Sequence, residues 1–145
     1  FKQLTMPNSG PIIVVDDDED DQQIIESVFR EMNTKNERKY FSTAKEVLDY
    51  LSGTSDQPFL IISDINLPIM DGPKLKEVIN ENEHLKKKSI PFVFLSTTAQ
   101  DIVVEKAYEM MVQGFFEKPS IQDEFRTLLK LILEYWRVCI HPNSY

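Results

Sequence analysis

The chain has 145 residues, of which 41% are hydrophobic, and this suits one domain with a sizeable core. Its formal net charge of −8 argues against a nucleic-acid-binding surface, which needs a basic stripe, and against adsorption to an anionic membrane. The single cysteine, Cys139, excludes an intrachain disulfide and is typical of a reducing compartment, so we expect a cytoplasmic protein. The apolar runs are too short to span a bilayer.

Short apolar runs alternate with segments of helical spacing along the chain. Segment 1–10 has no periodicity, and we expect a disordered leader or cloning remnant there, then a domain at 11–140 and a tail at 141–145. The apolar runs predict strands at 11–15, 39–42, 59–63, 91–95 and 114–117. The helical spacing predicts helices at about 20–32, 43–51, 73–85, 100–112 and 121–139.

This order of elements is a strand followed by a helix, repeated five times. Such alternation is typical of an α/β protein in which helices cover both faces of a five-stranded parallel sheet. Right-handed crossovers then make the sheet doubly wound. Ligands bind this architecture at the carboxyl ends of the strands, so the residues that follow each apolar run are the candidates for a site.

Polar residues follow four of the five predicted strands. They are Asp16 and Asp17 at the start of an acidic run, Asp64, the hydroxyl residues Ser96 and Thr97, and Lys118. Carboxylates about 4 Å apart repel by several kcal/mol at an effective dielectric near 20, so they stay ionised together only around a cation. Oxygen ligands of this kind suit Mg²⁺ or Mn²⁺. The metal, the lysine and a hydroxyl could then hold a phosphoryl group against a carboxylate nucleophile.

Each of these residues also has a plainer explanation. An acidic run before a helix often serves only to cap it and to complement its dipole, and Asp64 alone could be a turn residue. A calcium loop is excluded, because Asp21 stands where that loop needs glycine and Ser27 where it needs glutamate. The combination of acids, hydroxyl and lysine, each at a strand end, favours the site over the plainer explanations.

Four separated motifs resemble, in order and spacing, those of the response-regulator receiver family. They are IVVDDD at 13–18, IISDINLPIMDG at 61–72, PFVFLSTT at 91–98 and GFFEKP at 114–119. The resemblance covers about 11–137 and implies a flavodoxin-like (βα)5 fold with strand order 2-1-3-4-5. We expect a stand-alone, chemotaxis-type receiver of a two-component system.

The resemblance also implies a role for each matching residue. Asp64 matches the phosphorylated aspartate. Mg²⁺ would be held by Asp17 and Asp64, by the backbone carbonyl of Asn66, and by Asp16 largely through a water. Lys118 would pair with Asp64 and then with the phosphoryl group, and its peptide bond to Pro119 would be cis. Ser96 matches the switch hydroxyl and Phe115 the switch aromatic.

Two positions depart from the family pattern. Ser96 replaces the commoner threonine, and Thr97 stands where a very small residue is usual, so its bulk could slow access of phosphodonors or water to Asp64. The main alternative function is a Mg²⁺-dependent phosphohydrolase with an aspartyl-phosphate intermediate, for which Asp16 and Asp18 would form an Asp-x-Asp motif. Such enzymes need a substrate-selecting cap, for which this chain has little room.

The expected partners are a histidine kinase or phosphotransfer protein and a downstream protein target. The last predicted helix has a core stripe of Phe125, Leu128, Leu129, Ile132, Trp136 and Cys139. Further apolar residues lie outside it, namely Leu131, Leu133, Tyr135, Val138 and Ile140. A contiguous exposed stripe often marks an interface, and receivers pair through their last helices, so we expect a homodimer or partner contact there.

Overall fold

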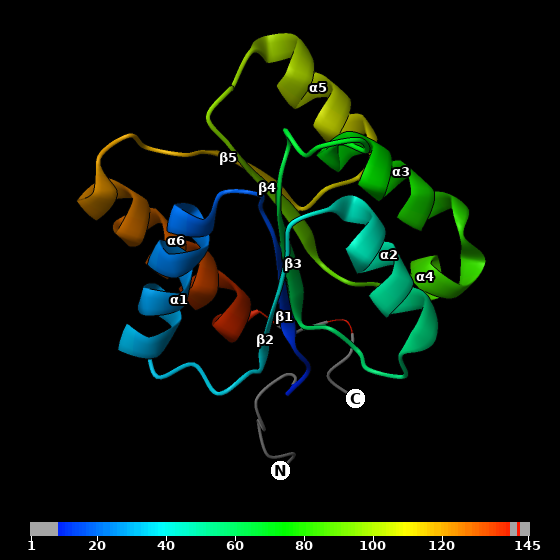
Figure 1. The fold of residues 1–145 in the computed structure, drawn as a ribbon, viewed down its shortest axis with the longest axis horizontal. Coiled ribbons are helices and arrows are strands. Elements are labelled where there is room, and N and C mark those ends of the chain that lie inside the picture. Colours follow the sequence, from blue (N-terminus) through cyan, green and yellow to red (C-terminus); the bar gives the residue numbers. More distant parts are fainter. Residues whose placement is uncertain (1–8, 140–141, 143–145) are drawn as a thin grey trace.

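The computed structural model describes residues 9–139 and residue 142 (Figure 1). Its strands are β1 (Ile12–Val15), β2 (Arg38–Phe41), β3 (Leu60–Asp64), β4 (Phe92–Ser96) and β5 (Gly114–Glu117). Its helices are α1 (Glu19–Glu31), α2 (Ala44–Gly53), α3 (Gly72–Glu81), α4 (Glu83–Lys87), α5 (Asp101–Glu109) and α6 (Gln122–Val138). The predicted leader and tail lie largely outside the described residues.

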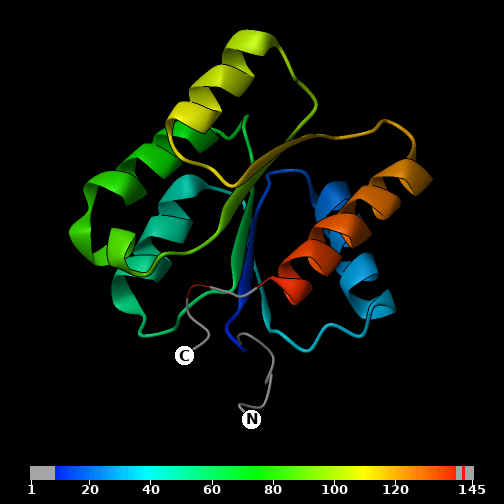
Figure 2. The same ribbon diagram turned by 180° about the vertical axis from the view of Figure 1, so that it is seen from behind.

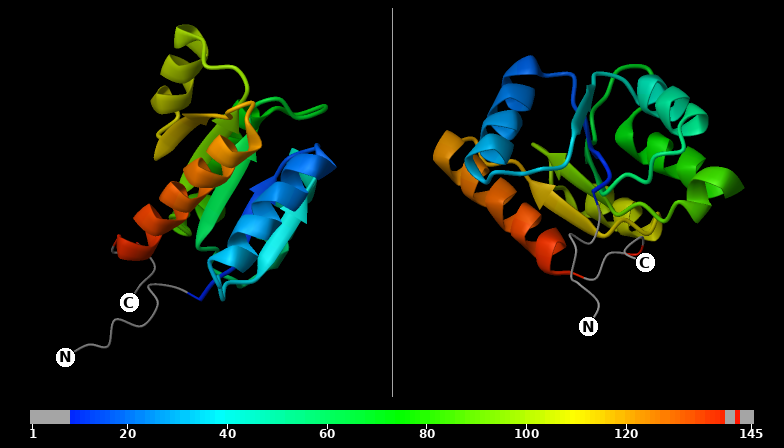
Figure 3. Two further views of the ribbon diagram at one scale, coloured as in Figure 1. Left: turned by 90° about the vertical axis from the view of Figure 1, so that its left-hand side faces the viewer. Right: turned by 90° about the horizontal axis from the view of Figure 1, so that it is seen from below.

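The five strands form one parallel sheet in the order β2-β1-β3-β4-β5. Helices α1 and α6 cover one face, and α2, α3, α4 and α5 lie on the other (Figures 1 and 2). The two layers on either side of the sheet are also visible from below in Figure 3. The prediction of a doubly wound, flavodoxin-like fold is therefore confirmed.

Alternation along the strands divides the core between the two faces of the sheet. Ile13 and Val15 of β1 pack in the cluster under α2 and α3, whereas Ile12 and Val14 pack in the cluster under α1 and α6. Both faces of β1 are buried, which explains why its sequence is continuously apolar and not alternating. Each of these side chains contributes about 1.5–3 kcal/mol by burial, so the sheet is anchored from both sides.

The predicted third helix is interrupted at Asn82. This residue has an extended backbone, ends α3, and caps α4 by accepting a hydrogen bond from the backbone N–H of Leu85 at 3.1 Å. The prediction of one helix at 73–85 is therefore wrong, because a side-chain cap competes with continuation of the helix. Helix α2 is capped by Thr43, whose Oγ1 accepts from the backbone N–H of Glu46 at 3.2 Å.

Helix α6 buries most of its predicted stripe. Phe125, Leu129, Ile132 and Trp136 are buried, and Leu128 and Cys139 are partly buried against the same cluster. Leu133, predicted to lie outside the stripe, is also buried, while Ile140 lies outside the described residues. Leu131, Tyr135 and Val138 are 64%, 59% and 79% exposed, so these three apolar residues form an outer stripe on α6. Among the described residues, no helix is both apolar enough and long enough to cross a bilayer.

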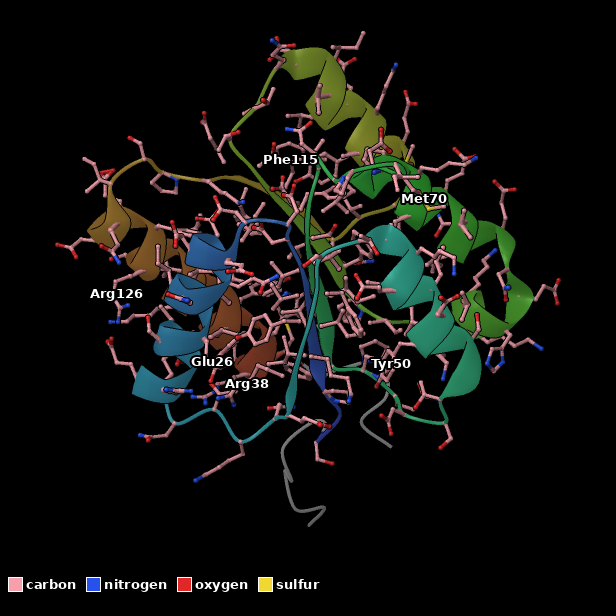
Figure 4. The ribbon with its side chains drawn as sticks, viewed as in Figure 1. Glu26, Arg38, Tyr50, Met70, Phe115 and Arg126 are labelled. Carbon is pink, nitrogen blue, oxygen red and sulfur yellow. The ribbon has the colours of Figure 1, made fainter. Side chains whose placement is uncertain are left out.

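A half-buried ion-pair network joins α1 to the edge strand β2. Glu26 accepts from the Arg38 guanidinium at 2.7 and 3.0 Å and from the Tyr40 hydroxyl at 2.5 Å (Figure 4). The hydrogen bond from Arg38 is the main reason that the pKa of Glu26 is lowered to about 2. Arg38 also donates to the backbone carbonyls of Thr34 and Asn36, so it organises the loop before β2.

We expect Glu26→Gln to lower the free energy of unfolding at pH 7 by about 2 kcal/mol, discounted for partial exposure of the side chain. Because the pKa of Glu26 is lower in the folded protein than in the unfolded chain, ionised Glu26 stabilises the fold at pH values above its unfolded pKa. This contribution is lost as the pH falls toward 2. The difference between wild type and Glu26→Gln should therefore shrink between about pH 4.5 and 2 in urea unfolding. Glu37→Gln, at an exposed pair with Lys39, is the control with little expected effect. A difference that does not change with pH would contradict this account.

Candidate functional site

Three carboxylates meet at the carboxyl end of the sheet. Asp16 and Asp17 follow β1, and Asp64 is the last residue of the neighbouring strand β3, whose Ser63 pairs with Val15. Each of the three acids offers an oxygen within 4.8 Å of the others. Asp16 is buried, Asp64 is half-buried and Asp17 is exposed, so the cluster opens toward solvent on the side of Asp17.

Lys118 reaches this cluster from the end of β5, two strands away from β3. Its Nζ donates to Asp16 Oδ2 at 2.8 Å, to Asp21 Oδ2 at 2.9 Å and to Asp64 Oδ2 at 3.1 Å. Only 5% of the lysine side chain is exposed. The structure thus brings Lys118 and the predicted acids together, and it adds Asp21, which the sequence analysis did not identify as a partner of the lysine.

Burial and ion pairing oppose each other in this cluster. Burial raises the pKa of Asp16, and the hydrogen bond from Lys118 offsets only part of that effect. Burial is the largest single effect on the pKa of Lys118 and lowers it, but the hydrogen bonds and charges of Asp16, Asp21 and Asp64 together outweigh burial, so the pKa of Lys118 is raised. Lys118 is therefore positively charged at neutral pH and lies among the carboxylates to which it donates.

Two carboxylates of the acidic loop after β1 make different hydrogen bonds. Asp18 caps α1 by accepting from the backbone N–H groups of Asp20 and Asp21 at 2.9 and 3.3 Å. Asp16 accepts from the backbone N–H of Asp18 at 2.9 Å, and Gln22 Nε2 donates to the Asp16 carbonyl at 2.6 Å. The capping explanation thus holds for Asp18. An Asp-x-Asp motif of Asp16 and Asp18 loses support, because the second acid is used as a cap.

The loop after β3 packs closely behind Asp64. A Cβ on Gly72 would lie 2.4 Å from the Asp64 carbonyl oxygen and 2.8 Å from the Phe94 ring, so only glycine fits there. Asn66, predicted to bind the metal through its carbonyl, is exposed, and its backbone N–H donates to Asp64 Oδ1 at 3.2 Å. This bond holds one oxygen of Asp64 while Lys118 holds the other.

The predicted switch residues lie beside the cluster. Ser96 ends β4 and is fully buried, and its hydroxyl accepts from the backbone N–H of Thr98 at 3.1 Å. Within the described part of the chain, no hydrogen bond joins Ser96 Oγ to the acids. Thr97 is exposed, and Phe115 is half-buried with its ring centroid 6.2 Å from that of Phe94. Figure 4 shows Phe115 near the end of the sheet below α5.

The prediction of a cis peptide bond between Lys118 and Pro119 is wrong for this structure, in which no described residue has a cis peptide. The trans form of an X–Pro bond is favoured by about 0.5–1 kcal/mol unless the surroundings select the other. With the trans bond, the backbone N–H of Lys118 donates to the Ser96 carbonyl at 2.7 Å, and its Nζ still reaches the acids.

The donor set suits a small divalent cation. Carboxylate oxygens from Asp16, Asp17 and Asp64 are hard ligands, and the exposed side of Asp17 leaves room for the waters that Mg²⁺ and Mn²⁺ keep. The described residues bring no histidine or cysteine into this group, which agrees with oxygen ligation.

Comparison with known proteins identifies the family. The family model described as "Response regulator receiver domain" matches residues 12–130. The probable methanogenesis regulatory protein FilR2 of Methanothrix harundinacea is 27% identical over 129 residues, which are 86% of this chain and 82% of FilR2. For other relatives the match spans a smaller share, down to 21% of one transcriptional regulator and 9% of one sensor kinase.

Solved structures agree in fold. The phosphorylated cyanobacterial phytochrome response regulator RcpA superposes with a TM-score of 0.84 at 25% identity, covering 92% of this chain and 98% of that one. The Mn²⁺-bound form of response regulator Rcp1 also has a TM-score of 0.84, at 24% identity, covering 92% and 99% of the two chains. The chain belongs to the response regulator receiver domain family of two-component signalling.

Proposed function

We propose that Asp64 is the phosphoacceptor, and that it takes a phosphoryl group from a histidine kinase or phosphotransfer protein. The observation that carries this proposal is the position of Asp64 Oδ2, 3.1 Å from the buried ammonium of Lys118 and within a cluster of acids. In the transfer, a carboxylate oxygen of Asp64 attacks phosphorus, the bond from phosphorus to the donor nitrogen breaks, and its electron pair stays on that nitrogen.

We further propose that Mg²⁺ is the cofactor, held by Asp17 and Asp64, the backbone carbonyl of Asn66 and, through a water, Asp16. When bound, the ion would supply positive charge that offsets the repulsion among the carboxylates and the phosphoryl oxygens. The closeness of the three carboxylates supports this proposal. The Mn²⁺-bound form of the similar protein Rcp1 is consistent with a divalent cation in this fold.

Lys118 would stabilise the phosphorylated state. Its Nζ now contacts three carboxylates, and one of these contacts, to Asp64, would be replaced by a contact to a phosphoryl oxygen. The positive charge would then lie where negative charge develops during the transfer. The raised pKa of Lys118 supports this role, since the side chain stays protonated.

The output would be a two-state change at β4 and β5. Ser96 would turn its hydroxyl from the Thr98 backbone N–H to a phosphoryl oxygen, and Phe115 would move into the vacated space. Phe115 is half-buried against Phe94, so it has room to become more buried.

The exposed Thr97 would slow the access of phosphodonors or water to Asp64. The domain would comprise 11–140, and its target would be a protein that recognises the altered surface.

The function is tested with a small phosphodonor, acetyl phosphate, in the presence and absence of Mg²⁺. We expect the intact mass of the protein to increase by one phosphoryl group only when Mg²⁺ is present. Asp17→Ala should raise the Mg²⁺ concentration needed for half-maximal labelling more than Asp16→Ala, because Asp17 is the proposed direct ligand. Equal labelling in excess chelator, or no labelling under any condition, would contradict the proposal.

We also propose self-association through the outer stripe of α6, namely Leu131, Tyr135 and Val138. The stripe borders a groove of about 660 Å³ between α6 and the edge strand β5, with mostly apolar walls. Leu131→Glu combined with Tyr135→Glu should lower the mass seen by light scattering without unfolding the protein. Ile69→Glu, at an exposed residue of the loop after β3, is the matched control. A wild type that is monomeric at high concentration, phosphorylated or not, would contradict self-association.

A further inference from the structure

A second cavity lies at the opposite end of the sheet from the acid cluster. It is bounded by α3, α4 and the residues just before β4 and β5, and its volume is about 500 Å³. Its walls are largely apolar and include Ile79, Leu85, Ile90, Met111 and Trp136. Among the described residues that line it there is no carboxylate, whereas two lysines, Lys76 and Lys86, do line it.

Lys76 of α3 is the unusual member of this lining. It is only 8% exposed, and its Nζ lies 5.5 Å from the centroid of the Phe92 ring. Within the described part of the chain, Lys76 has neither an ion pair nor a hydrogen bond. Burial lowers its pKa, and no neighbouring acid counteracts that effect. The contrast with Lys118, equally buried but bonded to three carboxylates, shows what Lys76 lacks.

Packing alone gives a partial account of Lys76. A cation over an aromatic ring gains about 0.5–2 kcal/mol, which offsets only part of the cost of burying an ammonium group. The two neighbouring amide side chains bond elsewhere and not to Lys76: Asn80 Nδ2 donates to the Met110 carbonyl, and Gln113 Oε1 accepts from the Phe92 backbone N–H. Lys76 therefore lines a cavity whose described residues offer apolar walls and a second lysine but no carboxylate.

We infer that this cavity binds a small carboxylate with a short apolar chain. The carboxylate would pair with Lys76, with Lys86 as the outer cation, and the chain would lie against the apolar wall that includes Trp136. The site has two features, an unpaired ammonium and apolar walls. A carboxylate would pair with the ammonium, and a hydrocarbon chain would lose its contact with water against the walls. The site is separate from Asp64, so the inference does not depend on the proposed phosphorylation.

The test uses hexanoate as probe and the fluorescence of Trp136, the only tryptophan of the sequence, as readout. Hexanoate should produce a saturable change, and hexan-1-ol, which has the same chain without the charge, should bind at least about tenfold more weakly. Lys76→Met, which keeps the apolar stem, should also weaken hexanoate binding at least about tenfold, and Lys76→Arg should restore much of it. Lys86→Met should have a smaller effect.

Three further measurements control for unfolding, for the Asp64 site and for the location of the probe. The thermal midpoint of Lys76→Met should equal or exceed that of wild type, which excludes unfolding as the cause of weaker binding. Asp64→Asn should bind hexanoate as wild type does. Backbone amide shifts should map the probe to Ser89 and Met111, which line this cavity, rather than to the groove beside Leu131. Unchanged binding by Lys76→Met, equal binding of hexan-1-ol, or no saturable change would overturn the inference and leave Lys76 with its contact to Phe92 alone.

Discussion

Lys118→Met should lower the free energy of unfolding by about 3–5 kcal/mol at neutral pH, because it leaves one buried and two half-buried carboxylates without their cation. Lys118 Nζ donates to Asp16, Asp21 and Asp64 within 3.1 Å, and Asp16 is buried. Methionine keeps much of the volume of the lysine stem, so the loss reports the charge and its hydrogen bonds rather than a cavity. For a domain of this size, this is a large share of the 5–15 kcal/mol typical of folded proteins.

Urea unfolding of Lys118→Met measures this loss. Lys74→Met, at an exposed pair with Glu77, is the matched control and should change the free energy of unfolding by less than about 1 kcal/mol. Adding Asp64→Asn to Lys118→Met should recover part of the loss, since one of the repelling carboxylates is removed. A loss no larger than that of Lys74→Met would show that Lys118 does not hold the cluster together.

The fold could be predicted from the sequence because its strands are buried on both faces. Continuous apolar runs such as Ile12–Val15 have no other stable place in a chain of this length. The alternation of strands and helices predicts the parallel arrangement, which places Asp16, Asp64 and Lys118 at one edge of the sheet.

The features that sequence reasoning missed depend on competition between local options. Asn82 could continue a helix or cap a new one, and only the packing of Leu85 of α4 into the core decides between them. The contact of Asp21 with Lys118 depends on the position of the first turn of α1, which a run of six acids leaves open. A signal existed in that run, because Asp18 is a good cap and fixes Asp21 in the first helical turn.

The unpaired Lys76 could not be recognised from sequence. Lysine at a helix position next to apolar residues is ordinarily read as a surface side chain whose stem covers the core. Its burial depends on tertiary packing. Its Nζ lies near the Phe92 ring of β4, and the residue lines a cavity beside α4 and the end of α6. Leu133 of α6 was likewise placed outside the core stripe, although the helix buries it against the sheet.

Asp64→Asn should reduce labelling by acetyl phosphate by on the order of a thousandfold or more, because the carboxylate is the proposed nucleophile and an amide oxygen is a poor one. The fold should survive, since asparagine is nearly isosteric and can still accept hydrogen bonds from the Asn66 backbone N–H and Lys118 Nζ. Circular dichroism and urea unfolding check that requirement.

A neighbouring acid gives the matched control for this loss. Asp71 lies in the same loop and caps α3 by accepting from the backbone N–H of Lys74 at 2.9 Å. Asparagine is as good a cap as aspartate, so Asp71→Asn should leave both labelling and stability close to wild type. A comparable loss of labelling in both variants would mean that the loop, and not the Asp64 carboxylate, is what the substitution disturbs.

The most direct measurement is the chemical identity of the modified residue in the wild-type protein. After reaction with acetyl phosphate and Mg²⁺, borohydride reduces an aspartyl phosphate to homoserine, and peptide mass spectrometry then locates the reduced residue. The proposed function predicts homoserine at position 64 and at no other acid of the cluster. Homoserine at position 16 or 17, with Asp64 unmodified, would contradict it.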